Sequence, residues 1–225
     1  MNPKQLAAEK AVEFLKDGMT VGLGTGSTAW WAIEKIGEKV KKEGWKIRAI
    51  ATSLRSEAQA RSLGIPIYGF DEIDEIDITI DGADEADSKL YLIKGGGGAL
   101  LREKIVATNS RQMIVVADDS KYVKTLGKFP LPVEVVLFGW EKTFQKLKAL
   151  GCEPKQRIDK DSGKPYLTDN GNYIVDCSFG SIPDPVALHE RINAITGVVD
   201  NGLFVNIASK LVLGYADGKV KVIGD

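Results

Sequence analysis

Short apolar runs alternate with helix-like segments through roughly the first half of this 225-residue chain. The apolar runs lie at residues 20–23, 47–51, 76–80 and 113–117, and segments with the apolar spacing of a helix separate them. A chain in which strands and helices take turns in this way forms a largely parallel sheet with helices on both faces. We therefore predict an α/β fold of the Rossmann-like type.

The pattern changes near residue 130, after a proline-rich run. Strand, helix, strand, hairpin and helix signals then follow, and one last strand is expected at residues 198–204. This order is typical of a small α+β domain of the ferredoxin-like type. The final residues predict a hairpin that turns at Asp217-Gly218 and rejoins the first domain. The predicted division is a Rossmann-like catalytic domain of residues 1–130 and 205–225, with a small α+β domain of residues 131–204.

Charge and composition narrow the class of protein. The chain has 30 basic and 31 acidic residues and a net charge of −1, whereas nucleic-acid binding usually shows as a basic excess. No run approaches the roughly 18 consecutive apolar residues of a membrane helix, and the charged N-terminus does not resemble a signal peptide. One histidine and two scattered cysteines do not form a zinc-binding pattern. We expect a cytoplasmic protein with no nucleic-acid partner and no membrane attachment.

The first loop suited to an anion is residues 22–28, which connects a strand to a helix. Its glycines let backbone N–H groups approach an anion, and the following helix directs its positive end to the same place. The hydroxyls of Thr25, Ser27 and Thr28 add donors, and Ser27 or Thr28 can also cap the helix. A phosphate monoester fits this loop. A dinucleotide would call for an acidic residue about 20 positions later, where neutral residues 51–53 stand. An ordinary glycine-rich turn also remains open.

The second loop holds two carboxylates, Asp81 and Asp84, separated by Gly82 and Ala83. Crowded carboxylates repel each other, so the pKa of one should rise and allow it to donate a proton to a bound oxygen. A solvated Asp-Gly turn and a magnesium site are the alternatives.

The third loop runs from Lys94 through four consecutive glycines into a helix. Such a run is costly in chain entropy, and close approach of the backbone to a ligand explains it better than a linker does. Lys94 supplies a positive charge, and Glu103 could reach back over the glycines from the helix. A surface partner of its basic neighbours is the alternative for Glu103. Lys121 follows a strand end and could contact a ligand. Lys4 could do the same, but it lies on the first helix and we interpret it as a solvated lysine.

All three loops follow predicted strands. In parallel α/β sheets, ligands bind at the carboxyl ends of the strands. We therefore expect the loops at residues 22–28, 81–85 and 94–98 to gather along one edge of the sheet and to form one site.

Four segments together resemble the A-type ribose-5-phosphate isomerase family: GLGTGSTA, IDGADE, KGGGGALLREK and LGKFPLPVEV. The resemblance extends over essentially the whole chain, with one small departure, since some members have KGGGAAL at the third segment. It implies the reversible interconversion of ribose 5-phosphate and ribulose 5-phosphate, with no cofactor and no metal. It also implies a homodimer or a homotetramer.

The resemblance assigns site residues as well. It implies that Glu103 is the proton-transfer base. It implies substrate contacts at Thr25, Gly26, Ser27, Thr28, Asp81, Gly82, Ala83, Asp84, Lys94, Gly95, Gly96, Gly97 and Lys121.

The isomerisation moves a proton between C1 and C2 through an enediol or enediolate. We expect Glu103 to carry that proton while Lys94, with the N–H groups of Gly95–Gly97, stabilises the oxyanion. Asp81 and Asp84 would handle the hydroxyl protons, in roles that the sequence does not divide. The first loop would anchor the phosphate.

Two other classes of function stay open at this point. A non-catalytic sugar-phosphate sensor would keep the phosphate loop without needing the glutamate, aspartate and lysine together, and fold does not fix function. Another sugar-phosphate enzyme, such as a lactonase or an amino-sugar deaminase, is the second rival.

Overall fold

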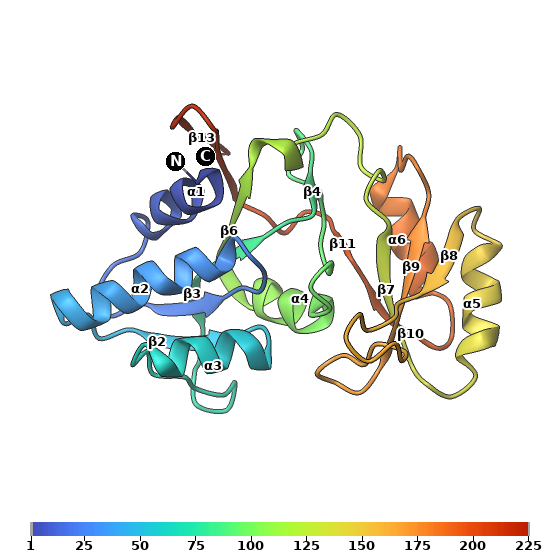
Figure 1. Ribbon diagram of the computed structural model, residues 1–225, viewed down its shortest axis with the longest axis horizontal. Helices are drawn as coiled ribbons and strands as arrows, with labels where there is room; N and C mark the ends of the chain where they lie inside the picture. The colour runs from blue at the N-terminus through green and yellow to red at the C-terminus, as the bar shows by residue number, and fades with distance from the viewer. Residues whose placement is uncertain (1, 225) are drawn as a thin grey trace. The chain divides into compact units, whose positions relative to one another are not determined.

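The computed structural model describes residues 2–224 and divides them into two compact units (Figure 1). The first, here called the parallel-sheet unit, contains the chain up to Ala83, Arg102–Tyr122 and the chain from Asn206 onward. The second, the antiparallel-sheet unit, contains Asp84–Leu101 and Val123–Val205. The division expected from the sequence placed residues 84–130 in the first domain, and its limits remain a prediction.

The parallel-sheet unit is built on a six-stranded sheet in the order β13-β12-β6-β3-β1-β2. Its strands are β1 (Thr20–Leu23), β2 (Arg48–Ala51), β3 (Ile76–Gly82), β6 (Ser110–Asp118), β12 (Lys210–Gly214) and β13 (Val220–Ile223). Every neighbouring pair is parallel except β12 and β13, which form the expected C-terminal hairpin. The prediction of a largely parallel sheet is confirmed.

Helices cover both faces of this sheet. On one face, α1 (Pro3–Val12), α2 (Ala29–Glu43) and α3 (Leu54–Ser62) share a hydrophobic core with β1, β3, β6 and β12. The opposite face meets α4 (Leu100–Thr108). Alternate residues of a strand point to opposite faces, and a Cβ on Gly22 of β1 would lie 2.7 Å from the Val106 side chain of α4. Gly22 therefore lets this helix approach the sheet closely.

The antiparallel-sheet unit contains a four-stranded sheet in the order β10-β7-β9-β8. Its elements follow one another as β7 (Leu131–Val135), α5 (Trp140–Lys148), β8 (Glu153–Gln156), β9 (Tyr173–Ser178), α6 (Pro185–Asn193) and β10 (Val198–Asn201). All neighbouring strands are antiparallel. This is the ferredoxin-like arrangement that the sequence predicts. Asp184 caps α6 by accepting a hydrogen bond from the N–H of Ala187.

A three-stranded sheet, in the order β11-β5-β4, completes this unit. Its strands are β4 (Glu85–Ala86), β5 (Leu92–Ile93) and β11 (Leu203–Phe204). The expectation of one strand at 198–204 is wrong, because Gly202 separates β10 from β11 and the two pair in different sheets. Gly202 donates its N–H to the Pro132 carbonyl and accepts the N–H of Lys94. A Cβ there would lie 2.2 Å from the Lys94 carbonyl oxygen, so no other residue fits without a shift.

Between Asn2 and Gly224, none of the helices has the length and apolar character required to cross a membrane.

Candidate active site

The loop between β1 and α2 depends on two glycines for different reasons. The N–H of Gly24 donates to the Ile80 carbonyl at 2.9 Å, and a Cβ on Gly24 would lie 2.2 Å from Oδ1 of Asp81. Gly26 has a φ of +114°, which side chains rarely adopt. The loop can therefore lie directly against the end of β3.

Asp81 links this loop to the second one. Its side chain is fully buried, and Oδ1 accepts the N–H groups of Thr25 at 2.9 Å and of Gly82 at 2.7 Å. Hydrogen bonds to a carboxylate are among the stronger ones in proteins. The structure thus brings together the first two loops that the sequence singles out. The expectation that the third loop joins them remains a prediction.

The hydroxyl of Thr25 has a different position from the one expected. Thr25 is buried, and Oγ1 lies 2.7 Å from Oγ1 of Thr52 and 2.8 Å from Oγ of Ser53. Ser56 adds a third hydroxyl and donates to the Gly24 carbonyl at 2.7 Å. The hydroxyls of Thr52, Ser53 and Ser56 therefore hold the buried side of the loop at residues 22–28 in place. Sequence reasoning missed the cluster because it took residues 51–53 only as the place where an acidic residue was lacking.

The start of α2 is not capped as predicted. Thr28 occupies the N-cap position, but its side chain makes no capping hydrogen bond. Ser27 instead meets Lys4 of α1, whose Nζ lies 2.9 Å from the serine Oγ. This contact is exposed, so the interpretation of Lys4 as a solvated lysine remains a prediction. A lysine charge and a hydroxyl stand beside the amide groups of the first turn of α2, where an anion is favoured.

Glu103 is only 3% exposed, in the first turn of α4. A side chain on the surface would be exposed to water, so the surface position in the alternative for Glu103 is wrong. A pairing with a basic neighbour remains a prediction. Burying a carboxylate costs free energy, and proteins often accept this cost at catalytic and binding sites. Lys121 is half-buried and ends the short 3-10 turn Asp119–Lys121 that follows β6.

In the antiparallel-sheet unit, Asp84 holds the glycine loop. Its Oδ2 accepts the N–H of Gly96 at 2.7 Å, and a Cβ on Gly96 would lie 2.5 Å from the same carboxylate. Gly95 and Gly98 have φ angles of +99° and +84°, and the N–H of Gly98 donates to the Gly95 carbonyl across the turn. Three of the four glycines, Gly95, Gly96 and Gly98, are thus required by backbone conformation or by close contact.

Lys94 is buried although it carries a charged side chain. It is 2% exposed, and its Nζ lies 5.4 Å from the centre of the Phe204 ring. A cation over an aromatic face is stabilised by the ring quadrupole. Its backbone N–H donates to the carbonyl of Gly202, so the backbone of Lys94 is held just before β11 and its side chain lies over Phe204 of β11.

Two supporting residues were missed in the sequence. Glu85 is buried and accepts the N–H groups of Gly127 and Phe129, each at 2.7 Å. Glu85 could have been found from the sequence because it belongs to the DGADE segment. Arg157 donates to the carbonyls of Gly95 and Gly96, and no local pattern marks it. Over residues 2–224, no three histidine, cysteine, aspartate or glutamate side chains are grouped as metal ligands.

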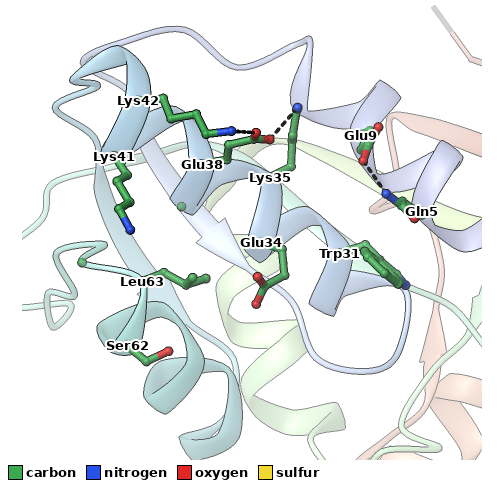
Figure 2. A pocket seen from close by; sticks show the side chains of 12 residues that line it. Gln5, Glu9, Trp31, Glu34, Lys35, Glu38, Lys41, Lys42, Ser62 and Leu63 are labelled. Carbon is green, nitrogen blue, oxygen red and sulfur yellow. Dashed lines mark hydrogen bonds and ion pairs between the residues drawn. The ribbon is translucent and has the colours of Figure 1, made fainter.

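A separate surface hollow of about 560 Å³ lies among α1, α2 and α3 of the parallel-sheet unit (Figure 2). Two of its lysines, Lys35 and Lys42, donate to the carboxylate of Glu38. Hydrogen bonds from these lysines lower the pKa of Glu38 to about 2. The carboxylate of Glu38 is therefore already bound by two lysines.

Known proteins match this chain over nearly its whole length. A family model described as "Ribose 5-phosphate isomerase A (phosphoriboisomerase A)" matches residues 48–218. Ribose-5-phosphate isomerase A of Bacillus mycoides (strain KBAB4) is 53% identical over 219 residues, which cover 97% of this chain and 98% of the relative. That of Parvibaculum lavamentivorans is 54% identical over 220 residues, which cover 96% and 95%.

Solved structures agree with these matches. A D-ribose-5-phosphate isomerase in complex with phospho-erythronic acid has a TM-score of 0.96 at 38% identity, with 100% of both chains covered. The ribose 5-phosphate isomerase A of Methanocaldococcus jannaschii has a TM-score of 0.94 at 41% identity and covers 99% of this chain and 98% of its own. On this agreement of family model, relatives and fold, the chain belongs to the ribose 5-phosphate isomerase A family.

Proposed function

We propose that Glu103 is the base with which this isomerase interconverts ribose 5-phosphate and ribulose 5-phosphate. An aldose–ketose isomerisation moves a proton between C1 and C2, and a carboxylate can take it from one carbon and return it to the other. The observation that carries this proposal is the burial of Glu103 at 3% exposure, in the same unit as the anion loop. A carboxylate away from water keeps the transferred proton from exchanging freely.

The phosphate group is proposed to bind at the start of α2. Its two charges would be met by the amide groups of the helix and by the hydroxyl of Ser27. Lys4 would add a positive charge, because its Nζ is already bonded to that hydroxyl. Thr25 and Thr28 complete the predicted contacts with the phosphate. Thr25 would act through its backbone, because its hydroxyl is hydrogen-bonded to Thr52 and Ser53.

Oxyanion stabilisation is proposed for Lys94 and for the amide groups of Gly95–Gly97. A positive charge acts more strongly where water is excluded, and Lys94 is 2% exposed. Asp81 and Asp84 are proposed to move the hydroxyl protons during ring opening and between O1 and O2. Lys121 is proposed as a further contact to substrate, and no metal or cofactor is needed for these steps.

The assembly and the location are also proposals. A homodimer or a homotetramer is supported by exposed apolar side chains on the antiparallel-sheet unit. Phe138 is 95% exposed, and its neighbours Leu137 and Val136 are also exposed. Light scattering after size-exclusion chromatography measures the assembly. The cytoplasm is proposed as the location.

The test is turnover by the purified chain after removal of metals. Ribose 5-phosphate should be converted to the ketose, and Glu103→Gln should lower kcat by at least ~10²-fold, the usual contribution of a positioned acid–base group. Glu43→Gln, at an exposed ion pair on α2, is the matched control. Near-normal turnover by Glu103→Gln would remove the proposed base. Saturable binding without turnover by the unaltered chain would favour the sensor instead.

A further inference from the structure

We propose that Arg157 is a positioning residue for this reaction: it holds the peptide group between Gly95 and Gly96, and through that peptide it orients the carboxylate of Asp84. The inference rests on the proposed function, because Asp84 is one of the residues expected to move hydroxyl protons. It concerns only residues of the antiparallel-sheet unit.

The guanidinium of Arg157 has two sets of partners. One edge binds Asp176 of β9, with Nε at 2.9 Å from Oδ2 and Nη2 on Oδ1. The other edge donates from Nη1 to the carbonyls of Gly95 at 2.8 Å and of Gly96 at 3.2 Å. The side chain is 14% exposed. A planar guanidinium can serve both edges at once, and its geometry is set by the bidentate contact with the carboxylate.

The contact reaches Asp84 through a single peptide group. The carbonyl of Gly95 accepts from Arg157, and the N–H of Gly96, on the other side of the same peptide bond, donates to Oδ2 of Asp84 at 2.7 Å. Hydrogen bonds in series polarise one another, so a cation on the carbonyl strengthens the N–H as a donor. Asp176, Arg157, the peptide and Asp84 therefore form one continuous chain of hydrogen bonds.

The glycine loop needs such a support. Glycine loses more conformational freedom on folding than any other residue, and this loop has four in succession. It has no side chains of its own to pack. Tyr166 supports its far end, because a Cβ on Gly98 would lie 2.2 Å from the tyrosine oxygen, and the Arg157 guanidinium lies 5.9 Å from the Tyr166 ring. Arg157 supports the other end of the loop, at Gly95 and Gly96.

The alternative to a positioning role is that Arg157 forms an ion pair with a purely structural role, and the experiment must distinguish the two. An ion pair that only ties Arg157, the residue after β8, to Asp176 of β9 would change the stability of the unit and leave kcat unaltered. A positioning residue would lower kcat more than it changes KM, because misplacement of a reacting group by about 1 Å can cost 10²-fold in rate. Its effect would also depend on the presence of the Asp84 carboxylate.

The experiment compares Arg157→Gln and Arg157→Lys with the unaltered chain in ribose 5-phosphate turnover. Arg157→Gln should lower kcat by roughly 10- to 100-fold with KM within about 3-fold. Arg157→Lys should recover little, because one ammonium cannot replace the two-edged fork. In an Asp84→Asn background, the further loss from Arg157→Gln should shrink below about 3-fold. Arg191→Gln, at an exposed position of α6, is the matched control.

Added guanidinium gives an independent readout. Gly96, Arg157 and Asp176 line a surface hollow of about 570 Å³, so a small cation can reach the vacated place. Millimolar guanidinium should raise the kcat of Arg157→Ala and leave the unaltered chain unchanged. If Arg157→Gln or Arg157→Ala does not fold, Asp176→Asn, which keeps the guanidinium but removes its anchor, should show a smaller loss of kcat.

The outcomes are distinct. Folded Arg157→Gln with a kcat within 2-fold of the unaltered chain overturns the inference alone, as do losses that multiply fully in the Asp84→Asn background. An unaltered chain that does not convert ribose 5-phosphate overturns the proposed function as well, and is recognised before any variant is compared.

Discussion

Replacing Gly24 by alanine tests the link between the phosphate loop and Asp81. The new Cβ would lie 2.2 Å from Oδ1 and 2.5 Å from Cα of Asp81, so relief requires a backbone movement and not only a side-chain rotation. Asp81 or the loop must shift by about 1 Å, and a shift of that size can cost about 10²-fold in rate. Overpacking of this kind lowers the free energy of unfolding by about 1–3 kcal/mol. Most domains tolerate that loss, so the variant should fold.

The assay for Gly24→Ala measures two quantities on the same samples. Ketose formation from ribose 5-phosphate gives kcat/KM, and urea denaturation gives the free energy of unfolding. Gly44→Ala is the control, because Gly44 ends α2 with a φ of +72° and an added Cβ there meets no atom within 4 Å. It should lose about 1–2 kcal/mol of stability from the left-handed backbone with unchanged kcat/KM. If folded Gly24→Ala kept kcat/KM within 3-fold of the unaltered chain, the close packing of loop and carboxylate would have no catalytic importance.

Three further predictions concern charged groups. Because the pKa of Glu38 is lowered to about 2 by Lys35 and Lys42, its contribution to stability is complete above its ordinary pKa of 4.5 and is lost as the pH falls toward 2. Glu38→Gln should therefore flatten the fall in urea midpoint between about pH 5 and pH 2.5, by a small amount because the pair is exposed; an unchanged slope would count against the pairing. Glu134 is fully buried and accepts hydrogen bonds from the turn at residues 168–172, so Glu134→Ala should lower the free energy of unfolding by about 2–3 kcal/mol in thermal or urea unfolding. A loss under about 1 kcal/mol would show that this turn finds other acceptors. Lys94→Ala should lower kcat more than it raises KM for ribose 5-phosphate, and a change in KM alone would make Lys94 a uniform-binding residue.

The fold class could be predicted from the sequence because its signals are local. Short apolar runs, such as residues 20–23 and 47–51, are each followed by a segment with helical spacing, and strand–helix units of this kind form a parallel sheet. The break at Gly202 could not be predicted in this way. Alternation of apolar residues shows that a strand forms but not with which sheet it pairs, and the atom that excludes a side chain at Gly202 is the carbonyl of Lys94, far away in the chain.

The candidate site likewise has features that the sequence predicts and features that it does not. By itself, the sequence determined which residue types lie at the ends of the strands, since the glycines, the carboxylates and Lys94 stand in recognisable segments whose chemistry is intrinsic to each. Only the tertiary structure decided how those groups are held. The Thr25 hydroxyl lies against that of Thr52, and Arg157 donates to the carbonyl of Gly95, 62 residues earlier in the chain. Hydrogen bonds of this kind join groups by distance in space, and no local periodicity or propensity records that distance.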